Sequence, residues 1–275
     1  MTNAELKNLC LSLACSDSEE EIIQLLKESG YWDDHQSWRY YGDNENNFAT
    51  IGNQQSTADT AIVEKIINLV DAVLMRECYR RNVRPNSSDA PKSTSDALKI
   101  LFGIHEGKLS NLNASGRTEL AQNISFIATG QKTNPCYSII DLGEGQSPES
   151  MPLTLLSLNK SNKLKIPFVQ GKFNMGATGS LQFCGTRNIQ LIISKRDPKI
   201  GDAKDQTASC WSFTVIRRED PSAGTRSSSF KYLAPNNRVL SFNADSLSLM
   251  PGEYPNPYGS KVDPFVNTVN GQFLD

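Results

Sequence analysis

The segment VEKIINLVDA, residues 63–72, carries three polar side chains at the spacings that an α-helix brings onto one side. At about 100° per residue, Asn68 lies about 40° from Glu64, and Asp71 lies about 20° from it in the other direction. Carboxylate and amide oxygens on one narrow stripe can accept protons or bind a cation. The same stripe also suits a surface helix whose polar side faces water, and this segment alone leaves both interpretations open.

A further carboxylate stands at the end of an apolar segment. Asp141 follows YSII and begins DLGEGQ, residues 141–146, which contains Gly143 and Gly145. A carboxylate at the end of a strand, followed by glycines, provides a fixed acceptor beside a backbone that can turn tightly and approach a ligand. A plain turn after a strand could carry the same residues, so this motif alone does not decide.

Glycines also punctuate GKFNMGATGS, residues 171–180, ahead of the apolar LQFCG. Glycine-rich backbone near the start of a helix presents several N–H groups to an anion, and the helix dipole adds partial positive charge. The spacing is not that of the phosphate-binding loop G-x-x-x-x-G-K-[ST], because Lys172 follows the first glycine and Ser180 the last. A surface loop is the alternative.

Taken in order, these motifs resemble those of the GHKL superfamily of ATPases, which includes DNA gyrase, a heat-shock chaperone, sensor histidine kinases and the MutL mismatch-repair proteins. EKIINLVDA resembles the family motif E-x-x-x-N-x-x-D-A, DLGEG the D-x-G-x-G adenine box, and GKFNMGATG the glycine-rich box that ends the lid over ATP. The resemblance covers residues 58–218. It implies a Bergerat-type ATP-binding fold: an α/β two-layer sandwich of a mixed, mostly antiparallel sheet with helices on one face. The extensions match none of the well-known branches, so we expect a bacterial-type branch outside them.

The resemblance implies a role for each residue of the helical stripe. Glu64 is expected to be the catalytic base that orients or deprotonates the attacking water, since hydrolysis of a γ-phosphate needs an acceptor within hydrogen-bond reach of the nucleophile. Asn68, one turn further on, is expected to reach Mg²⁺. Asp71 is expected to line the same pocket and to hold the nucleotide or ordered water.

The other two motifs imply contacts with the base and the phosphates of ATP. Asp141 is expected to accept a hydrogen bond from the adenine amino group, which a guanine carbonyl cannot supply, so that ATP is selected over GTP. Gly143 and Gly145 are expected to let the backbone pass close to the base. The residues expected to offer amide donors to the phosphates are Gly176, Ala177, Thr178 and Gly179.

The sequence departs from the family pattern in two places. The usual Gly-Thr pair before the last strand is absent, and Thr207, Ser209 and Ser212 stand in that neighbourhood. A phosphate-sensing lysine, which some relatives contribute from a following domain, is not identified. The lysines in or beside the expected lid, each more simply interpreted as a solvated charge, are Lys160, Lys163, Lys165 and Lys172.

Three functions stay open. We expect a slow, Mg²⁺-dependent ATPase that acts as a nucleotide-driven conformational switch in a larger defence or DNA-transaction system. The first alternative is an interaction module that senses ATP without hydrolysing it. A histidine-type protein kinase is less favoured, because Glu64 is present and neither His35 nor His105 lies in a phosphoacceptor helix. A nucleotide-dependent homodimer, an unidentified protein partner and nucleic-acid binding stay open.

The elements that must position these motifs are helices early in the chain and strands later. Apolar periodicity and N-cap residues predict two short helices within residues 4–29, a long helix over 60–81, another over 95–105 and helical structure at 151–160. The apolar segments expected to be strands are 123–130, 136–143, 188–194 and 210–218, together with FKYLA and RVLSF. The first two form a hairpin. The residues of the long helix expected to pack on a sheet are Ile62, Ile66, Leu69, Val70, Val73 and Leu74.

Three parts are expected along the chain. Residues 1–57 are interpreted as an N-terminal helical extension and strap, in which 31–60 show neither helical nor strand periodicity. Residues 58–220 are the expected ATP-binding domain. Residues 221–275 are interpreted as a C-terminal extension, or as the start of a following region.

Composition narrows the class of protein. A chain of 275 residues with 38% hydrophobic content can bury a sizeable core, and 28 basic against 30 acidic residues give no overall attraction to nucleic acid or an anionic membrane. The six cysteines are scattered and there are only two histidines, which favours reduced thiols over zinc sites or disulfides. Neither a signal peptide nor a long apolar run is present, so we expect a soluble, cytoplasmic protein.

Overall fold

The computed structural model describes residues 1–158, 163–171, 178–200, 205–221, 227–245 and 247, and the backbone of 268–273. These residues form six α-helices and an antiparallel sheet, a mixed α/β architecture. The helices are α1 (Asn3–Cys15), α2 (Glu19–Glu28), α3 (Asn47–Gly52), α4 (Ala58–Arg80), α5 (Thr94–Phe102) and α6 (Ala114–Ala121). The strands are β1 (Trp38–Tyr40), β2 (Ile124–Gln131), β3 (Asn134–Asp141), β4 (Gln190–Lys195), β5 (Trp211–Glu219), β6 (Ser229–Leu233), β7 (Leu240–Phe242) and β8 (Thr268–Phe273).

The strands lie in the order β1-β6-β5-β4-β8-β3-β2, and β7 pairs with β5. Every strand pair in the described part of the chain is antiparallel, so the mixed sheet expected from the resemblance is not found there. A parallel pair needs a long crossover connection, whereas β2 and β3 are joined by a tight turn. The sheet also crosses both expected domain boundaries, because β1, β6 and β7 belong to it as well.

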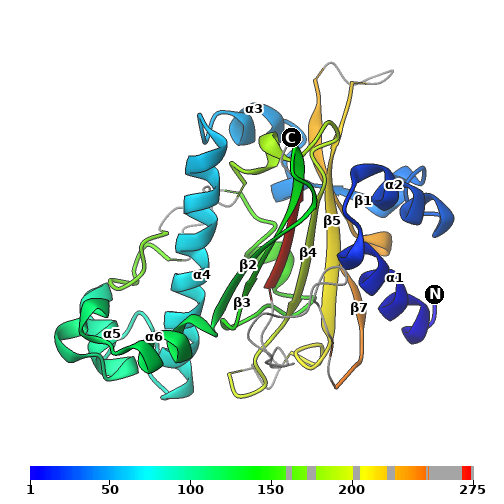
Figure 1. Cartoon of the computed structure of the whole chain (residues 1–275). Helices are drawn as coiled ribbons and strands as arrows, with labels where there is room; N and C mark the ends of the chain where they lie inside the picture. The colour runs from blue at the N-terminus through cyan, green and yellow to red at the C-terminus, as the bar shows by residue number, and fades with distance from the viewer. Residues whose placement is uncertain are drawn as a thin grey trace.

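Helices cover both faces of this sheet. Figure 1 shows α4 on one side of the strands and α1 and α2 on the other. The expected arrangement with helices on one face therefore needs correction for the whole chain, because the helices of the N-terminal part add a further layer. Strand side chains alternate in direction, and both sides of β4 are apolar: Leu191 packs in the cluster beneath α1 and α2, while Ile192 packs in the cluster on the opposite face.

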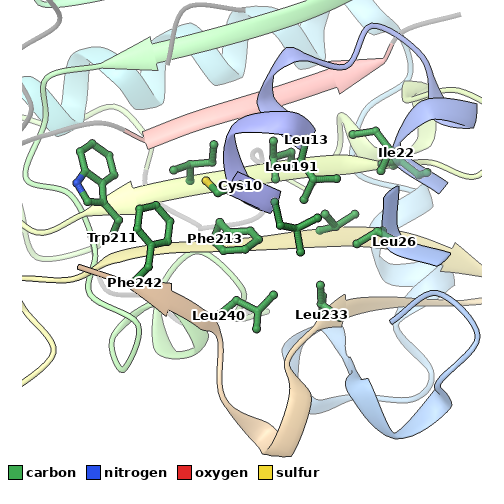
Figure 2. Close-up of a cluster of buried hydrophobic side chains, with 14 of the residues drawn as sticks. Cys10, Leu13, Ile22, Leu26, Leu191, Trp211, Phe213, Leu233, Leu240 and Phe242 are labelled. Carbon is green, nitrogen blue, oxygen red and sulfur yellow. The ribbon is translucent and has the colours of Figure 1, made fainter. Parts of the chain in front are cut away.

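The layer beneath α1 and α2 is a closely packed apolar core. Figure 2 shows Cys10 and Leu13 of α1 and Ile22 and Leu26 of α2 beside side chains of the sheet. Phe213 of β5 is fully buried among them, and the sheet side chains drawn around it are Leu191, Trp211, Leu233, Leu240 and Phe242. The burial of these apolar side chains holds α1 and α2 on the sheet.

Local sequence signals account for most element boundaries. Ser18, which precedes three glutamates, accepts the backbone N–H of Glu21 at 3.3 Å and begins α2. Thr57 accepts the N–H of Thr60 at 3.4 Å and begins α4, so the long helix starts slightly earlier than predicted. The predicted hairpin is confirmed, with Ile124 paired to Asp141 at the open end of β2 and β3.

Other expectations are corrected. The predicted helix at 151–160 is reduced to a single 3₁₀ turn at Met151–Leu153, which includes a proline. The segment 31–60 contains β1 and α3 in place of an irregular strap, and α6 was not predicted. All six cysteines are free thiols. Within the described residues, no helix combines the length and apolar character needed to cross a membrane.

Candidate functional site

A cavity of about 1010 Å³ lies between α4 and the loops that follow β3. One wall is the inward side of α4, with Lys65, Asn68, Leu69, Ala72, Met75 and Tyr79. The facing wall contains Asp141, Glu144, Gly145, Gln146 and Ser147. This volume is at the upper end of the range of small-molecule binding sites, and the wall combines apolar side chains with many polar and charged ones.

The polar stripe of α4 is turned into the protein at two of its three residues. Asn68 lines the cavity and Asp71 is 1% exposed, whereas Glu64 is at intermediate burial and does not line the cavity. Leu69, Val73 and Leu74 are buried as predicted, but Ile66 and Val70 are 39% and 37% exposed, so their prediction was wrong. Helical periodicity shows which residues share a side, while the neighbouring elements decide which side is buried.

Asp141 ends β3 at the base of the cavity. The residue is 3% exposed, and its Oδ1 accepts the backbone N–H of Gly143 at 2.8 Å. Burial raises the pKa of its carboxyl to about 7, although the Gly143 N–H and the positive charge of Lys163 act against that rise. No other group in the described part of the chain hydrogen-bonds to the Asp141 carboxylate, so Oδ2 can accept a bond from a ligand.

Gly143 is the point where the turn after β3 comes closest to α4. A Cβ atom on Gly143 would lie 2.5 Å from the Cβ of Ala72 and 2.4 Å from Oδ1 of Asp141. The small residues at both positions are therefore needed for α4 and Asp141 to lie together. The first and second motifs therefore meet at the contact between Ala72 and Gly143.

Two features favour glycine at position 145: its positive φ angle and the close approach of the end of β4. Its φ is +62°, and a Cβ atom there would lie 1.7 Å from the carbonyl oxygen of Lys195. Arg196, the next residue, donates to the Gly145 carbonyl at 2.9 Å and to the Glu144 carboxylate at 3.1 Å. These contacts hold the loop at the edge of the cavity.

Asp71 holds the beginning of the glycine-rich segment. Its Oδ1 accepts the backbone N–H of Gln170 at 2.9 Å, and its Oδ2 accepts that of Gly171 at 2.8 Å. The ammonium group of Lys163 lies 3.6 Å from Oδ2. The expectation that Asp71 lines the pocket needs correction, because Asp71 is not a lining residue and its oxygens are engaged by backbone.

Asn68 lines the cavity, and its amide oxygen lies beside Gly171. Its Nδ2 donates to the carbonyl of Glu64 at 3.0 Å, which fixes the amide, and a Cβ atom on Gly171 would lie 2.5 Å from its Oδ1. An amide oxygen held in this way fits a single ligand to Mg²⁺, which commonly takes its other ligands from water and phosphate. The described residues contain no group of three or more His, Cys, Asp or Glu side chains that could hold a metal ion.

Glu64 lies one turn before Asn68 on α4, at intermediate burial. It is not among the residues that line the cavity. The structure therefore brings Asn68, Asp141 and Gly145 to one cavity and leaves the Glu64 carboxylate outside its wall.

The end of the glycine-rich segment packs on residues that precede α4. Thr178 is 1% exposed and donates through Oγ1 to Oε1 of Gln54. A Cβ atom on Gly179 would lie 2.4 Å from Cγ of Gln55. Neither Thr178 nor Gly179 lines the cavity. The other two expected phosphate contacts, Gly176 and Ala177, lie outside the described residues, as do Lys160 and Lys172.

Of the hydroxyl residues near β5, Ser212 and Thr207 contact residues of the cavity wall. Ser212 is fully buried, donates to the carbonyl of Ser194 at 2.9 Å and lies 3.5 Å from that of the lining residue Gln146. Thr207 donates to the carboxylate of Asp205, another lining residue, at 2.7 Å. Ser209 is exposed.

Several lining residues were not predicted. The clearest is Lys65, which is 3% exposed. Its position in the sequence could have indicated its burial, because it lies inside the first motif, about 40° from the buried Leu69 on the helical wheel. Tyr79 lines the cavity further along α4, beneath the guanidinium of Arg196 at 5.8 Å. Of the lysines in or beside the expected lid, Lys163 and Lys165 line the cavity.

The chain matches no protein-family model and no curated protein sequence. The function of the chain is therefore inferred from the cavity and from the residues of the motifs that line it.

Proposed function

We propose that this chain binds ATP with Mg²⁺ in the cavity beside α4, hydrolyses it slowly and acts as a nucleotide-driven conformational switch. The observation that carries the proposal is that motifs distant in sequence supply one cavity: Asn68 from the first, Asp141 and Gly145 from the second. The antiparallel sheet with α4 against it supports a Bergerat-type core in residues 58–220, to which α1 and α2 add a layer.

Asp141 recognises the adenine base in this proposal. Oδ1 is engaged by Gly143, and Oδ2 accepts a hydrogen bond from the exocyclic amino group. Guanine presents a carbonyl oxygen at that place, so it would leave a buried carboxylate without a donor. Such a loss costs about 1–3 kcal/mol, which favours ATP over GTP.

Asn68 holds the metal side of the nucleotide. Magnesium supplies charge neutralisation at the phosphate oxygens and fixes their orientation. The Asn68 amide oxygen is the protein ligand, and its Nδ2 bond to the Glu64 carbonyl keeps that oxygen in place. Asp71 acts indirectly, because it positions Gly171 against Asn68.

Glu64 is the proposed acceptor for the proton of the attacking water. A base for this step must lie within hydrogen-bond reach of the water, and catalytic geometry often tightens only in the substrate complex. Glu64 lies one helical turn from Asn68, so water beside the terminal phosphate would be near its carboxylate.

A second candidate function is an ATP-sensing module that does not hydrolyse the nucleotide. The observation that favours it is the position of Glu64 outside the cavity wall. If the side chain does not reach water beside the terminal phosphate, the same adenine and metal contacts would bind ATP without turnover.

Calorimetric binding and phosphate release separate these proposals. We expect the wild type to bind ATP with Mg²⁺ more tightly than GTP, and Asp141→Ala to lose adenine binding. Glu64→Gln should keep binding and lose phosphate release. Asp59→Asn, which changes an exposed acid in the first turn of α4, is the matched control and should behave as the wild type. Binding without phosphate release in the wild type would favour the sensing module, and absence of binding to any adenine nucleotide would overturn both.

A further inference from the structure

The buried ammonium group of Lys65 differs from the other cations of the cavity. The basic side chains of Lys163 and Arg196 have acidic partners, Asp71 at 3.6 Å and Glu144 at 3.1 Å. Arg84 and Lys165 line the cavity but are exposed to water. Lys65 is 3% exposed, and no hydrogen bond or ion pair joins it to any described residue.

A buried cation without an acceptor is costly, so the site calls for a partner. Burial lowers the pKa of Lys65 to about 8, and the ionisable neighbour that opposes this is the thiol of Cys184, not a carboxylate. An uncharged side chain of similar length would fill the same space without that cost. Since Lys65 also lines the cavity, a group bound there is in a position to provide that acceptor.

The position of Lys65 on α4 indicates which part of a ligand it meets. The base of the cavity is at Asp141, which lies beside Ala72 through the Gly143 contact. Lys65 precedes Ala72 by seven residues on the continuous helix, about 10 Å along its axis. Asn68 lies between them. A nucleotide with its base at Asp141 and its phosphates towards Asn68 extends in the direction of Lys65.

We propose that Lys65 donates a charge-assisted hydrogen bond to a phosphate oxygen of the nucleotide bound in the cavity. This inference rests on the proposed function. It assigns phosphate recognition to a residue within the helical motif, where the ligand provides the acceptor that the folded chain does not.

The test compares ATP, adenosine and inorganic tripolyphosphate by calorimetry on the full chain. Lys65→Met is the main variant, and Lys99→Met, at an exposed lysine of α5, is the matched control. One charge-assisted contact corresponds to about a ten- to hundredfold change in affinity. We expect Lys65→Met to lose that factor for ATP and for tripolyphosphate and to bind adenosine as the wild type does.

The outcomes distinguish a phosphate contact of Lys65 from a structural role. Equal loss of ATP and adenosine binding in Lys65→Met would assign the lysine a structural role and overturn the inference, as would unchanged ATP binding. If Lys65→Met does not fold, Lys65→Gln replaces it in the test. Failure of the wild type to bind tripolyphosphate would overturn the inference without any variant. Lys65-dependent binding of tripolyphosphate with no binding of ATP or adenosine would refute the nucleotide proposal alone.

Discussion

The carboxylate of Asp71 accepts the backbone N–H of Gly171 at 2.8 Å, across 100 residues of chain. Together with the bond from the Gln170 N–H, it attaches the start of the glycine-rich segment to the helix that carries Glu64 and Asn68. The first and third motifs are thus joined directly in the folded protein.

Asp71→Asn should destabilise the protein by about 1–3 kcal/mol, because an amide in this place presents one of its donors to a backbone donor. Unfolding in urea measures the loss. Asp59→Asn, at an exposed position on the same helix, should change the free energy of unfolding by no more than about 0.5 kcal/mol. Equal stability of Asp71→Asn and the wild type would show that the two backbone bonds contribute little.

Gly143→Ala should cost about 1–3 kcal/mol of stability and displace Asp141, because the added methyl meets both Ala72 and the Asp141 carboxylate. The control is Gly52→Ala at the end of α3, where no heavy atom lies within 4 Å of the added methyl. That change should be neutral or stabilising by up to about 1 kcal/mol. Thermal unfolding of both variants tests the contact. A Gly143→Ala variant as stable as the wild type would contradict the predicted clash.

Lys65→Met should stabilise the protein at neutral pH. The pKa of Lys65 is about 8 in the folded state and 10.5 as its ordinary value, so the unfolded chain binds more protons between these values and wild-type stability rises with pH across that window. A shift of this size corresponds to about 3 kcal/mol. Urea unfolding from pH 6.5 to 10.5 should show a gain for the variant that shrinks above pH 8. A less stable variant at pH 7 would contradict the cost assigned to the buried charge.

Asp141→Asn should stabilise the protein above pH 7. Burial raises the carboxyl pKa from 3.8 to about 7, so the folded state binds more protons between these values and wild-type stability falls as the pH rises through them. The full effect is about 4 kcal/mol. Free energies of unfolding at pH 4 and pH 8 measure it, and the gain should appear only at the higher pH. A gain of equal size at both would point to packing instead of charge.

Binding of adenosine and ATP should depend differently on pH. Adenosine affinity should rise as the pH rises through about 7, because ionised Asp141 is the stronger acceptor. ATP affinity should also fall above about 8, where Lys65 loses its proton. Burial raises the pKa of Tyr79, which therefore stays neutral. The remaining acids and lysines of the wall are Glu144, Glu149, Lys163, Lys165 and Asp205. Calorimetry from pH 6 to 9 tests this, and Lys65→Met should lack the fall above pH 8.

Local signals in the sequence predicted the hairpin of β2 and β3 and the extent of α4 within two residues, and they left Ser16 and Ser18 as alternative N-caps, of which Ser18 caps α2. Each depends on a few neighbouring residues: a tight turn, an apolar period or a side chain that accepts a nearby N–H. The short elements β1 and α3 carry too few residues to show a period, so they were missed.

The sequence by itself determined that Glu64, Asn68 and Asp71 share one side of a helix and that Asp141 ends a strand, because both follow from backbone geometry over a few residues. Only the tertiary structure decided that Asp71 is buried and holds Gly171, and that Asn68 and Lys65 line the cavity with Asp141. These relationships depend on how closely α4 approaches the turn at Gly143, and such long-range packing leaves no periodic trace in the chain.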